Sequence, residues 1–537
     1  MRVPLKNPWW SLAVAAALVC GGLPAWAAQN APAKGNDQVP LGSPDFYPSP
    51  AHPVGWRGDG TGHFPGATPP TTWSRGANGE RKNILWEAKL PCYSWATPIV
   101  VGGKVFTRSE PYDLICLDKN SGKILWMRSH PPFIAVTKEE KKANPAFREI
   151  EPLVAELQKL NDAFAAMGWS KELYKQKHDL QKQIDDLTAK ADKKYKLPPD
   201  MYVESWSGYT GATPVSDGQS IFVSSGCGIS ACYDLNGNRK WERFENVTRI
   251  WNEHGVACSP WVSGDKLFVH TIGLHALDKA TGKEVFAFED PAPWEPFAIT
   301  PLEIGGAAYV IVNGTIYRAS DGKIAVRRPP DLASNLVVVC GNMAYYTAGR
   351  AAYYRLEPKR DGGLVSTPLI KEEYERLNFP AGDNPKYKID TSISDFYTAS
   401  PLHHDGLLYC LGNWGRLVVV DTQKYKSTDA VVYTSFLPFD LKNGFSRKTT
   451  GMGICASPAL AGKYIYMIDS AGCVLVLDPG REYKQIAKNN IDETVPEGWE
   501  QKYWMGPHHE QTEAALTFDG SRIYLRGEQY FYCVGKK

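Results

Sequence analysis

The sequence predicts an all-β fold, an eight-bladed β-propeller of four-stranded antiparallel blades with an inserted helical hairpin. Three observations predict it: a recurring unit of four short apolar runs, an isolated apolar strand before the first unit, and a composition rich in turn-forming and aromatic residues. Glycine (48) and proline (39) separate short strands, and tyrosine (27) and tryptophan (17) suit pleated surfaces. Length alone would suggest that the 537 residues form several domains, but a repeating unit can build one large domain, so the repeats decide the prediction.

The repeating unit is clearest in residues 96–126, 212–241 and 258–286. Each of these stretches begins with a small residue followed by Ser or Thr and then Pro. A glycine-containing turn, two apolar runs and a last turn follow, and the second apolar run ends in aspartate. Four short apolar runs separated by turn signals are typical of a four-stranded antiparallel meander, which is one propeller blade.

Weaker units follow at residues 300–323, 336–356, 400–421, 457–478 and 519–534. The unit at 336–356 has lost most consensus residues, so a seven-bladed ring stays an alternative. The last unit has three strands, and residues 83–87 stand before the first unit as an unpaired fourth strand. Pairing these two segments would close the ring and leave no open sheet edge.

The end of the unit carries a motif, Ala-x-Asp-x-x-Thr-Gly-x-x-x-Trp. It is present as Ala276, Asp278, Thr281 and Gly282 with Phe286 in the tryptophan place, and as Cys116, Asp118, Ser121, Gly122 and Trp126. The motif resembles the signature of the PQQ-like (quinoprotein alcohol dehydrogenase-like) repeat family. Residues 56–62 and Trp73 are also similar to the lead-in of exported propellers of this family. The resemblance implies that Asp and Thr-Gly shape the last hairpin and that Trp docks between adjacent blades.

The amino-terminal residues predict export. Arg2 and Lys6 precede an apolar core at 9–19, which is too short to span a bilayer, and residues 25–27 form a small-x-small cleavage site. We therefore expect a Sec-type signal peptide at 1–27, a flexible leader at 28–54, the propeller at 55–537, and a periplasmic or secreted protein. No later apolar run is long enough for a transmembrane segment. Sixty basic against 58 acidic residues give no basic footprint for nucleic acid.

Ten of the 11 cysteines would remain after cleavage, in a compartment where disulfides form. Cys116, Cys232 and Cys533 share one strand position, which favours buried thiols packing as small apolar side chains. Disulfide pairing stays open. The sequence contains neither Cys-x-x-Cys-His nor a pair of Cys-x-x-Cys motifs, so it predicts no c-type haem and no zinc site of that kind.

Two insertions interrupt the units. Within residues 137–196, apolar side chains recur at helical spacing on two segments, and Ser170 is a suitable N-cap between them, which predicts a helical hairpin. The hairpin joins the outer strand of one blade to the inner strand of the next, on the face that also carries the loops between second and third strands. It is interpreted as a decorative insertion, a lid or a docking arm. Residues 357–396 are expected to form an irregular insertion on the same face.

Polar and aromatic residues cluster where that face surrounds the central channel. Those that precede inner strands are Tyr93, Ser94, Trp95, Tyr209, Trp251, Asn252, His254, Trp504, His508 and His509. Those in loops between second and third strands are Glu110, Asn413, Trp414, Arg416 and Asp469. The candidates for ligand binding among them are Trp95, Trp251, His254, Trp414, Asp469 and His508. Aromatic walls with few polar groups suit a planar or sugar-like ligand, although ordinary loop residues of a tryptophan-rich fold give the same pattern.

No metal site is predicted, because adjacent histidines such as His508 and His509 point in opposite directions on an extended chain. Catalytic residues stay unknown. The first functional hypothesis is a non-catalytic binding or scaffold module of the cell envelope, with an envelope protein or a small-molecule or glycan ligand as partner. The resemblance here is to the propeller subunit of the outer-membrane protein assembly machinery. PQQ-dependent dehydrogenases of the family carry an adjacent Cys-Cys pair, and this sequence has none.

The alternative hypothesis is a PQQ-dependent quinoprotein oxidoreductase acting on alcohols or sugars. The resemblance would then imply PQQ with Ca²⁺ in the channel, Trp414 as the platform for the quinone and His254 or Asp469 as the base. A glycan-binding propeller that uses Trp95 and Trp414 on the same face is a third reading.

Overall fold

The computed structural model describes residues 39–75, 80–198, 208–247, 258–271, 273–288, 298–328, 337–347, 350–371, 375–380, 383–384, 389–390, 399–439, 456–470, 472–491, 512, 514–527 and 529–536. The chain divides into two units, Met1–Lys34 and Gly35–Lys537, and every described residue lies in the second. The description below concerns that unit alone.

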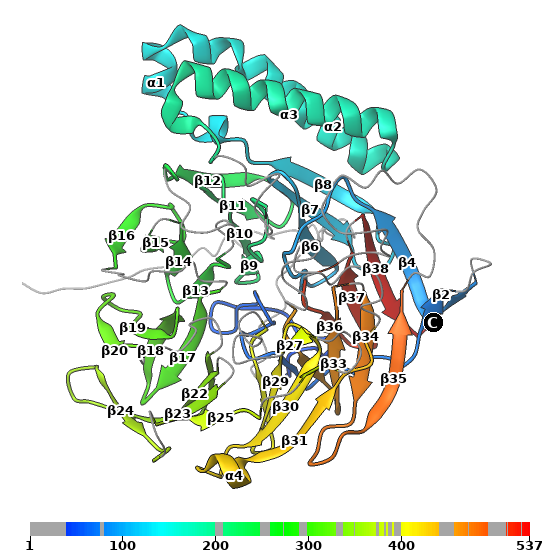
Figure 1. Cartoon of the computed structure of the whole chain (residues 1–537). Coiled ribbons are helices and arrows are strands. Elements are labelled where there is room, and N and C mark those ends of the chain that lie inside the picture. The colour runs from blue at the N-terminus through cyan, green and yellow to red at the C-terminus, as the bar shows by residue number, and fades with distance from the viewer. Residues whose placement is uncertain are drawn as a thin grey trace, which may run out of the picture. The chain divides into compact units, whose positions relative to one another are not determined.

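Eight four-stranded antiparallel sheets stand side by side around an axis, as the sequence predicts (Figure 1). Blade 1 contains β5 (Ile99–Val101), β6 (Lys104–Ser109), β7 (Asp113–Asp118) and β8 (Ile124–Ser129). Blade 2 contains β9 (Val215–Ser216), β10 (Ser220–Ser224), β11 (Ile229–Asp234) and β12 (Arg239–Phe244). Blade 3 contains β13 (Trp261–Ser263), β14 (Lys266–His270), β15 (Leu274–Asp278) and β16 (Glu284–Ala287). Blade 4 contains β17 (Thr300–Ile304), β18 (Ala307–Val312), β19 (Thr315–Arg318) and β20 (Ile324–Val326).

The other half of the ring follows the same plan. Blade 5 contains β21 (Val337–Cys340), β22 (Met343–Thr347), β23 (Arg350–Pro358) and β24 (Leu364–Pro368). Blade 6 contains β28 (Leu402–His404), β29 (Leu407–Leu411), β30 (Arg416–Asp421) and β31 (Val431–Phe436). Blade 7 contains β32 (Ala459–Ala461), β33 (Tyr464–Ile468), β34 (Cys473–Leu477) and β35 (Gln485–Asn490). Blade 8 contains β36 (Thr517–Asp519), β37 (Arg522–Arg526), β38 (Tyr530–Gly535) and β4 (Ile84–Lys89).

Blade 5 is complete despite its weak consensus, so the ring has eight blades and not seven. Part of the irregular insertion expected at 357–396 belongs to this blade, because β23 runs to Pro358 and β24 occupies Leu364–Pro368. The short strand β25 (Leu377–Asn378) pairs with β23, and β26 (Asp383–Asn384) pairs with β27 (Ile389–Asp390). The Asp-x-x-Thr-Gly motif that ends other units is missing here, which is why the fourth strand, β24, falls within the segment expected to be an insertion.

The ring closes as predicted. The strand β4 pairs antiparallel with β38, placing Trp86 opposite Cys533 and Glu87 opposite Tyr532. Figure 1 shows the two strands next to each other, although they come from opposite ends of the propeller sequence. Pairing removes the unpaired backbone groups that both strands would otherwise present at an edge.

The motif at the end of each repeat unit shapes a hairpin and docks a neighbour. Asp118 accepts hydrogen bonds from the backbone N–H of Asn120 (3.1 Å) and Ser121 (2.8 Å), and Gly122 follows at a φ of 71°. A Cβ on Gly122 would stand 2.4 Å from the indole of Trp86 in the preceding blade. Glycine is therefore needed at this position both for its positive φ and for the close approach of the tryptophan.

The Ser/Thr-Pro start of each unit forms hydrogen bonds around the channel. The backbone N–H of Thr97 donates to the hydroxyl of Thr213 (3.0 Å), and that of Thr213 donates to Ser259 (3.0 Å). In the other half, the N–H of Ser400 donates to Ser457 (2.9 Å). Each hydroxyl satisfies a buried N–H of the preceding blade, which explains why the residue type recurs.

Residues 39–75, the lead-in, cover the turns between first and second strands on one face of the ring. The strand β1 (His63–Phe64) pairs in parallel with β32 of blade 7, and Val54 forms a bridge with Ser216 of blade 2. The buried guanidinium of Arg57 donates to the carbonyls of Pro401 (3.1 Å) and Pro458 (3.2 Å) in blades 6 and 7. From residue 39 onward, the segment predicted as a leader over 28–54 thus packs on the blades. The proposed domain boundaries stay predictions.

Candidate functional site

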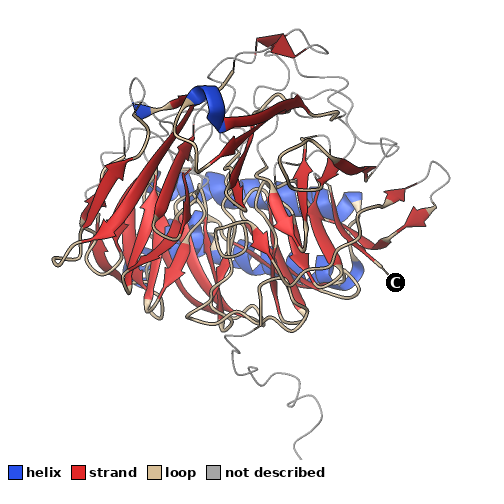
Figure 2. Ribbon diagram, turned by 90° about the horizontal axis from the view of Figure 1, so that it is seen from below, coloured by secondary structure: helices blue, strands red, loops and turns tan. Residues whose placement is uncertain are grey.

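The predicted helical hairpin is present and lies along the outer edge of blade 1. It contains α1 (Lys138–Ala143), α2 (Glu151–Met167) and α3 (Lys171–Ala191), with 3-10 turns at Pro132–Ala135, Pro145–Glu149 and Lys193–Tyr195. The hydroxyl of Ser170 accepts from the N–H of Leu173 (3.1 Å), as its reading as an N-cap predicts. The helix α2 packs on β8, the outer strand of blade 1 (Figure 1), and in the view turned by 90° both long helices run behind the strands (Figure 2).

The two ends of the hairpin contact the blades on either side of blade 1. At the tip, the ammonium of Lys89 in β4 lies 3.6 Å from the ring centre of Trp169. At the base, the rings of Tyr195 and Phe244 of blade 2 are 4.7 Å apart. The hairpin therefore spans blades 8, 1 and 2, including the blade in which the ring closes. We call it the brace.

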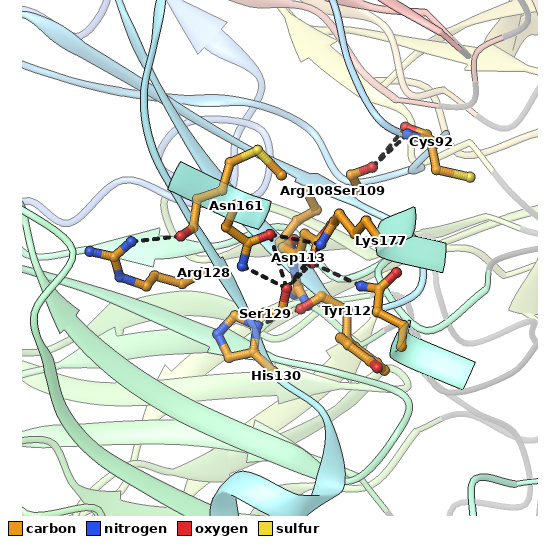
Figure 3. Close-up of polar contacts among 12 residues, drawn as sticks. Cys92, Arg108, Ser109, Tyr112, Asp113, Arg128, Ser129, His130, Asn161 and Lys177 are labelled. Carbon is orange, nitrogen blue, oxygen red and sulfur yellow. Dashed lines mark hydrogen bonds and ion pairs between the residues drawn. The ribbon is translucent and has the colours of Figure 1, made fainter. Parts of the chain in front are cut away.

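A buried polar cluster attaches the brace to blade 1 (Figure 3). The ammonium of Lys177 on α3 donates to Asp113 (3.0 Å), to Asn161 on α2 (2.8 Å) and to Ser129 (3.1 Å). Lys177 is 2% exposed and Asp113 is fully buried. Burial raises the pKa of Asp113 and lowers that of Lys177, and their mutual attraction opposes both shifts. The ion pair and its hydrogen bonds fix the brace to the loop that begins β7.

The same loop contacts the brace at a second point. The hydroxyl of Tyr112 donates to the carboxylate of Asp185 on α3 (3.2 Å), and burial raises the pKa of Asp185 well above its usual range. His130 is fully buried beneath the brace, with Nδ1 2.5 Å from the carbonyl of Tyr112. Burial lowers the pKa of His130 to about 3, so its imidazole is neutral and donates from Nδ1.

The face that bears the loops between second and third strands, here called the mouth face, carries a buried acid. The carboxylate of Glu110 accepts from the N–H of Tyr209 (3.0 Å) and Thr210 (2.7 Å), and from the hydroxyl of Thr210. Burial raises the pKa of Glu110 to about 7, against the opposing effect of these hydrogen bonds and of Arg108. A Cβ on Gly208 would lie 2.4 Å from this carboxylate, so glycine permits the contact.

A buried arginine connects the same loop to blade 2. Arg108 at the end of β6 donates to the carbonyl of Ser224 (2.7 Å) and to the hydroxyl of Ser225 (2.5 Å). Burial lowers the pKa of Arg108 to about 10, and the negative charge of Glu110 opposes the shift. The two charged residues hold the loop, the connection to blade 2 and blade 2 itself in one arrangement.

The six residues predicted to bind a ligand fall into three groups according to their place in the structure. Trp95 and Trp414 are half-buried, on blades 1 and 6 respectively. Asp469 of blade 7 is fully buried and accepts the N–H of Cys473 (2.8 Å), so it caps its own turn. Trp251, His254 and His508 lie outside the described residues, as do Asn252, Trp504 and His509.

The remaining predicted mouth residues lie where the topology places them. The carbonyl of Tyr93 accepts the N–H of Glu110 (2.9 Å), and the hydroxyl of Ser94 donates to the carbonyl of Thr210 (2.9 Å). Segments before inner strands and loops between second and third strands therefore share one face, as expected. Tyr209 is buried, and its hydroxyl donates to the carbonyl of Pro198 (3.1 Å). Asn413 and Arg416, which lie on either side of Trp414 in the sequence, are also buried.

Sequence reasoning missed the Lys177–Asp113 pair. Its signal was present, because Lys177 interrupts the apolar stripe formed by Leu173, Leu180 and Ile184 on α3. A lysine on a buried helix face requires a buried partner. The partner lies in a different repeat unit, so spacing along the helix does not identify it.

The described residues give no metal centre: among them, no three His, Cys, Asp or Glu side chains are grouped as ligands would be. Cys116, Cys232 and Cys533 are buried free thiols, as predicted. Burial raises the pKa of the Cys116 and Cys533 thiols to about 12 and that of Cys232 to about 11. Within the described stretches, no helix combines the length and apolarity needed to cross a membrane.

Comparison with known proteins agrees with the repeat. Residues 206–288, which include blades 2 and 3, match a PQQ-like repeat family model described as outer membrane protein assembly factor BamB. The match confirms the resemblance to the PQQ-like repeats. The search of curated proteins gave no match.

Solved propellers resemble the chain at low sequence identity. BamB from Moraxella catarrhalis shares 14% identity over 60% of this chain and 83% of its own, with a TM-score of 0.39. Quinohemoprotein alcohol dehydrogenase from Comamonas testosteroni shares 10% identity over 84% of this chain and 77% of its own, with a TM-score of 0.46. A europium-containing methanol dehydrogenase shares 11% identity over 82% and 84%, with a TM-score of 0.45.

Proposed function

We propose that this PQQ-like β-propeller is a non-catalytic binding or scaffold module of the cell envelope, exported by its amino-terminal signal. The observation that carries the proposal is the arrangement of Arg108 and Glu110. Both are buried on the mouth face, and their hydrogen bonds go to neighbouring loops and to blade 2. Groups bonded in this way fix the shape of a surface, which is what a binding face requires.

The two faces of the ring support the mouth face as the binding surface. The lead-in covers turns of the opposite face, with Arg57 bonded to blades 6 and 7 and Val54 to blade 2. The half-buried Trp95 precedes the inner strand of blade 1, and the half-buried Trp414 lies in the β29–β30 loop of blade 6, which are both segments of the mouth face. Exposed aromatic surface beside fixed polar groups is typical of binding sites for proteins and for sugar-like ligands.

The brace adds a supporting argument. Its Lys177–Asp113 pair is inaccessible to solvent, and its tip and base contact blades 8 and 2. A helical element held in one position offers a partner a preformed surface, which lowers the entropic cost of association. The brace lies along the outer edge of blade 1, which favours a docking arm over a lid.

The name of the matching model gives the kind of partner. That model is described as an outer membrane protein assembly factor, and we extend to this chain a protein partner in the envelope. A periplasmic or secreted location belongs to the same proposal and depends on the predicted signal peptide at 1–27.

The PQQ-dependent alternative keeps one supporting feature, the half-buried Trp414 at the mouth. Among the described residues, no three His, Cys, Asp or Glu side chains gather as ligands, so this part of the mouth offers the cation of a quinone site no carboxylate cluster.

A direct titration tests the alternative. Purified protein is titrated with PQQ and Ca²⁺ while tryptophan fluorescence and quinone absorbance are followed, and reduction of an artificial electron acceptor by alcohols and sugars is measured. We expect neither saturable binding nor turnover. Saturable binding that Trp414→Ala weakens would establish the quinoprotein reading instead.

Photo-crosslinking in cells tests the scaffold proposal. A benzophenone amino acid replaces Trp95 or Trp414 on the mouth face, and the exposed Asp45 on the lead-in provides the matched control. We expect discrete crosslinks to envelope proteins from the mouth positions and none from Asp45. Equal crosslinking from both faces, or none from either mouth position, would contradict the proposal.

A further inference from the structure

A histidine lies between two carboxylates at the junction of blades 2 and 3. His275 on β15 has Nε2 3.1 Å from Oε1 of Glu245, which follows β12 of blade 2. Its Nδ1 lies 3.1 Å from Oε2 of Glu284 on β16 of blade 3. The three side chains are partly buried, with 14%, 21% and 38% of their surfaces exposed.

The geometry fixes the charge of the imidazole. A neutral imidazole carries one N–H, so the lone pair of its second nitrogen would face a carboxylate oxygen. Only the protonated ring donates to both carboxylates. We propose that His275 is a proton-dependent clasp, which joins blades 2 and 3 when it is protonated and releases Glu245 when it loses the proton.

The charged groups around the clasp are named by their contacts. Arg243 on β12 pairs with Oε2 of Glu284 (2.6 Å), and the hydroxyl of Thr271 in the β14–β15 loop donates to Glu245. Burial lowers the pKa of His275, but Glu245 and Glu284 outweigh burial and Arg243, and the resulting pKa is raised. The same contacts lower the pKa of Glu245 against its own burial.

The clasp holds the start of a connection on the mouth face. The N–H of Glu245 donates to the carbonyl of Gly228 (2.9 Å) in the β10–β11 turn, and Glu245 opens the link to blade 3. That link includes Trp251 and His254, two of the ligand-binding candidates. Protonation of His275 thereby controls how firmly Glu245 is held at the junction of blades 2 and 3, which goes beyond the proposed scaffold role and does not depend on it.

The sign of the pH effect follows from the raised pKa. A histidine with a folded pKa above its unfolded value contributes stability that is fully present below about pH 6.5 and is lost as the pH rises through the folded pKa. The blade 2–blade 3 junction is therefore expected to loosen on the alkaline side.

Histidine NMR tests the first half of the proposal. The protein contains 11 histidines, and the spectrum of His275→Gln identifies the resonance of His275 in the full chain. We expect a titration midpoint above the ordinary value of about 6.5, moved downward by Glu245→Gln. A midpoint at or below that value, or one that Glu245→Gln leaves unchanged, overturns the clasp.

Hydrogen exchange tests the second half. The exchange rate of the Glu245 amide, corrected for its intrinsic pH dependence, is compared between wild type and His275→Gln at about pH 5.5 and about pH 8.5. We expect protection to be several-fold higher in wild type at the lower pH and equal in both proteins at the higher. A difference of the same size at both pH values overturns the proposal.

His404→Gln is the matched control for both measurements. His404 contacts one carboxylate, Asp405, at 3.3 Å, and both residues belong to a single turn of blade 6. We expect this substitution to leave the titration of His275 and the exchange of Glu245 unchanged at either pH.

Discussion

Two arcs of the ring join their blades with different side chains. In the tryptophan arc, blades 8, 1 and 2, an outer-strand indole donates to a carbonyl in the last turn of the next blade. The bonds are Trp86 to Lys119 (3.2 Å), Trp126 to Leu235 (3.2 Å) and Trp241 to Lys279 (2.9 Å). In the tyrosine arc, blades 4 to 7, the third residue of the second strand is a tyrosine, and in blades 4, 6 and 7 its hydroxyl forms the link. The bonds are Tyr309 to Gly362 (3.1 Å), Tyr409 to Gly480 (3.4 Å) and Tyr466 to Pro70 of the lead-in (3.4 Å).

The difference shows that the hydrogen bond between neighbouring blades can come from a tryptophan on the outer strand or from a tyrosine on the second strand. Where the outer tryptophan is present in blades 1 and 2, the second-strand aromatic is Phe106 or Phe222, which has no hydroxyl. In blades 4, 6 and 7, where the tryptophan is missing, a tyrosine hydroxyl reaches the same turn or the lead-in. Blade 3 has neither group and relies on Phe286 packed on Gly322 of blade 4. Loss of the consensus tryptophan is therefore compensated and does not indicate a loose blade.

The largest expected effect comes from breaking the brace, which spans the tryptophan arc. Lys177→Met leaves the Asp113 carboxylate buried without its counter-charge and should destabilise the protein by about 3–5 kcal/mol in urea unfolding. Lys159→Met removes an exposed pair with Glu156 and should change stability by less than about 1 kcal/mol. Adding Asp113→Leu to Lys177→Met should recover much of the loss, and equal losses for the two single variants would contradict the role of the buried pair.

A methyl group at the Trp241 contact tests the packing of the tryptophan arc. Gly282→Ala places a Cβ 2.5 Å from the indole of Trp241 at a φ of 71°, and should cost about 3 kcal/mol. Gly264→Ala has a similar φ of 61° with no heavy atom within 4 Å, and should cost about 1 kcal/mol. Thermal unfolding of both variants measures the difference, and equal melting temperatures would show that the indole does not restrict this position.

Glu110, on the mouth face of blade 1, should make the folding stability of the protein depend on pH. The folded pKa of Glu110, about 7, lies above the ordinary value of 4.5, so ionisation is disfavoured by folding. Stability should therefore fall as the pH rises from about 4.5 to about 7, by about 3 kcal/mol. Glu110→Gln should remove this component in chemical unfolding measured across the range, and identical pH profiles for the two proteins would refute it.

The smallest effect tests the tyrosine arc. The hydroxyl of Tyr409 donates to the carbonyl of Gly480 and accepts its N–H (2.8 Å), so Tyr409→Phe should cost about 1 kcal/mol. Tyr425→Phe, at a tyrosine that is 40% exposed, serves as the control and should be neutral. Chemical unfolding compares them, and a neutral Tyr409→Phe would show that the tyrosine arc does not depend on its hydroxyls.

The features that the sequence predicts are those that depend on local, repeated chemistry. The Asp118–Ser121 turn, the Ser/Thr-Pro starts and the unpaired strand at 83–87 each leave a periodic signal. The tyrosine links were not predicted, because the substitute residue stands in a different strand from the tryptophan it replaces. The lead-in contacts of Arg57 were missed because they join one non-repeating segment to carbonyls, which have no side-chain signature.

The candidate site was predicted less completely than the fold. Topology correctly assigned Tyr93, Ser94 and Glu110 to one face. It gave no indication that Asp469 caps its own turn, or that Arg108 and Lys177 are buried. The contacts of Arg108 and Lys177 join different blades and insertions, so they depend on which of these elements face each other. The roles assigned to Trp95 and Trp414 stay predictions.

The pairing of β4 with β38 has a consequence for biosynthesis. Residues 84–89 emerge from the ribosome before the intervening blades, whereas their partner at 530–535 is made after them. While the intervening blades are synthesised, the apolar strand β4 has unpaired backbone groups. It can therefore pair incorrectly with another strand. Contacts between such distant segments form slowly, so the closing step should limit how fast newly made chains mature and should determine how much they need a holding chaperone.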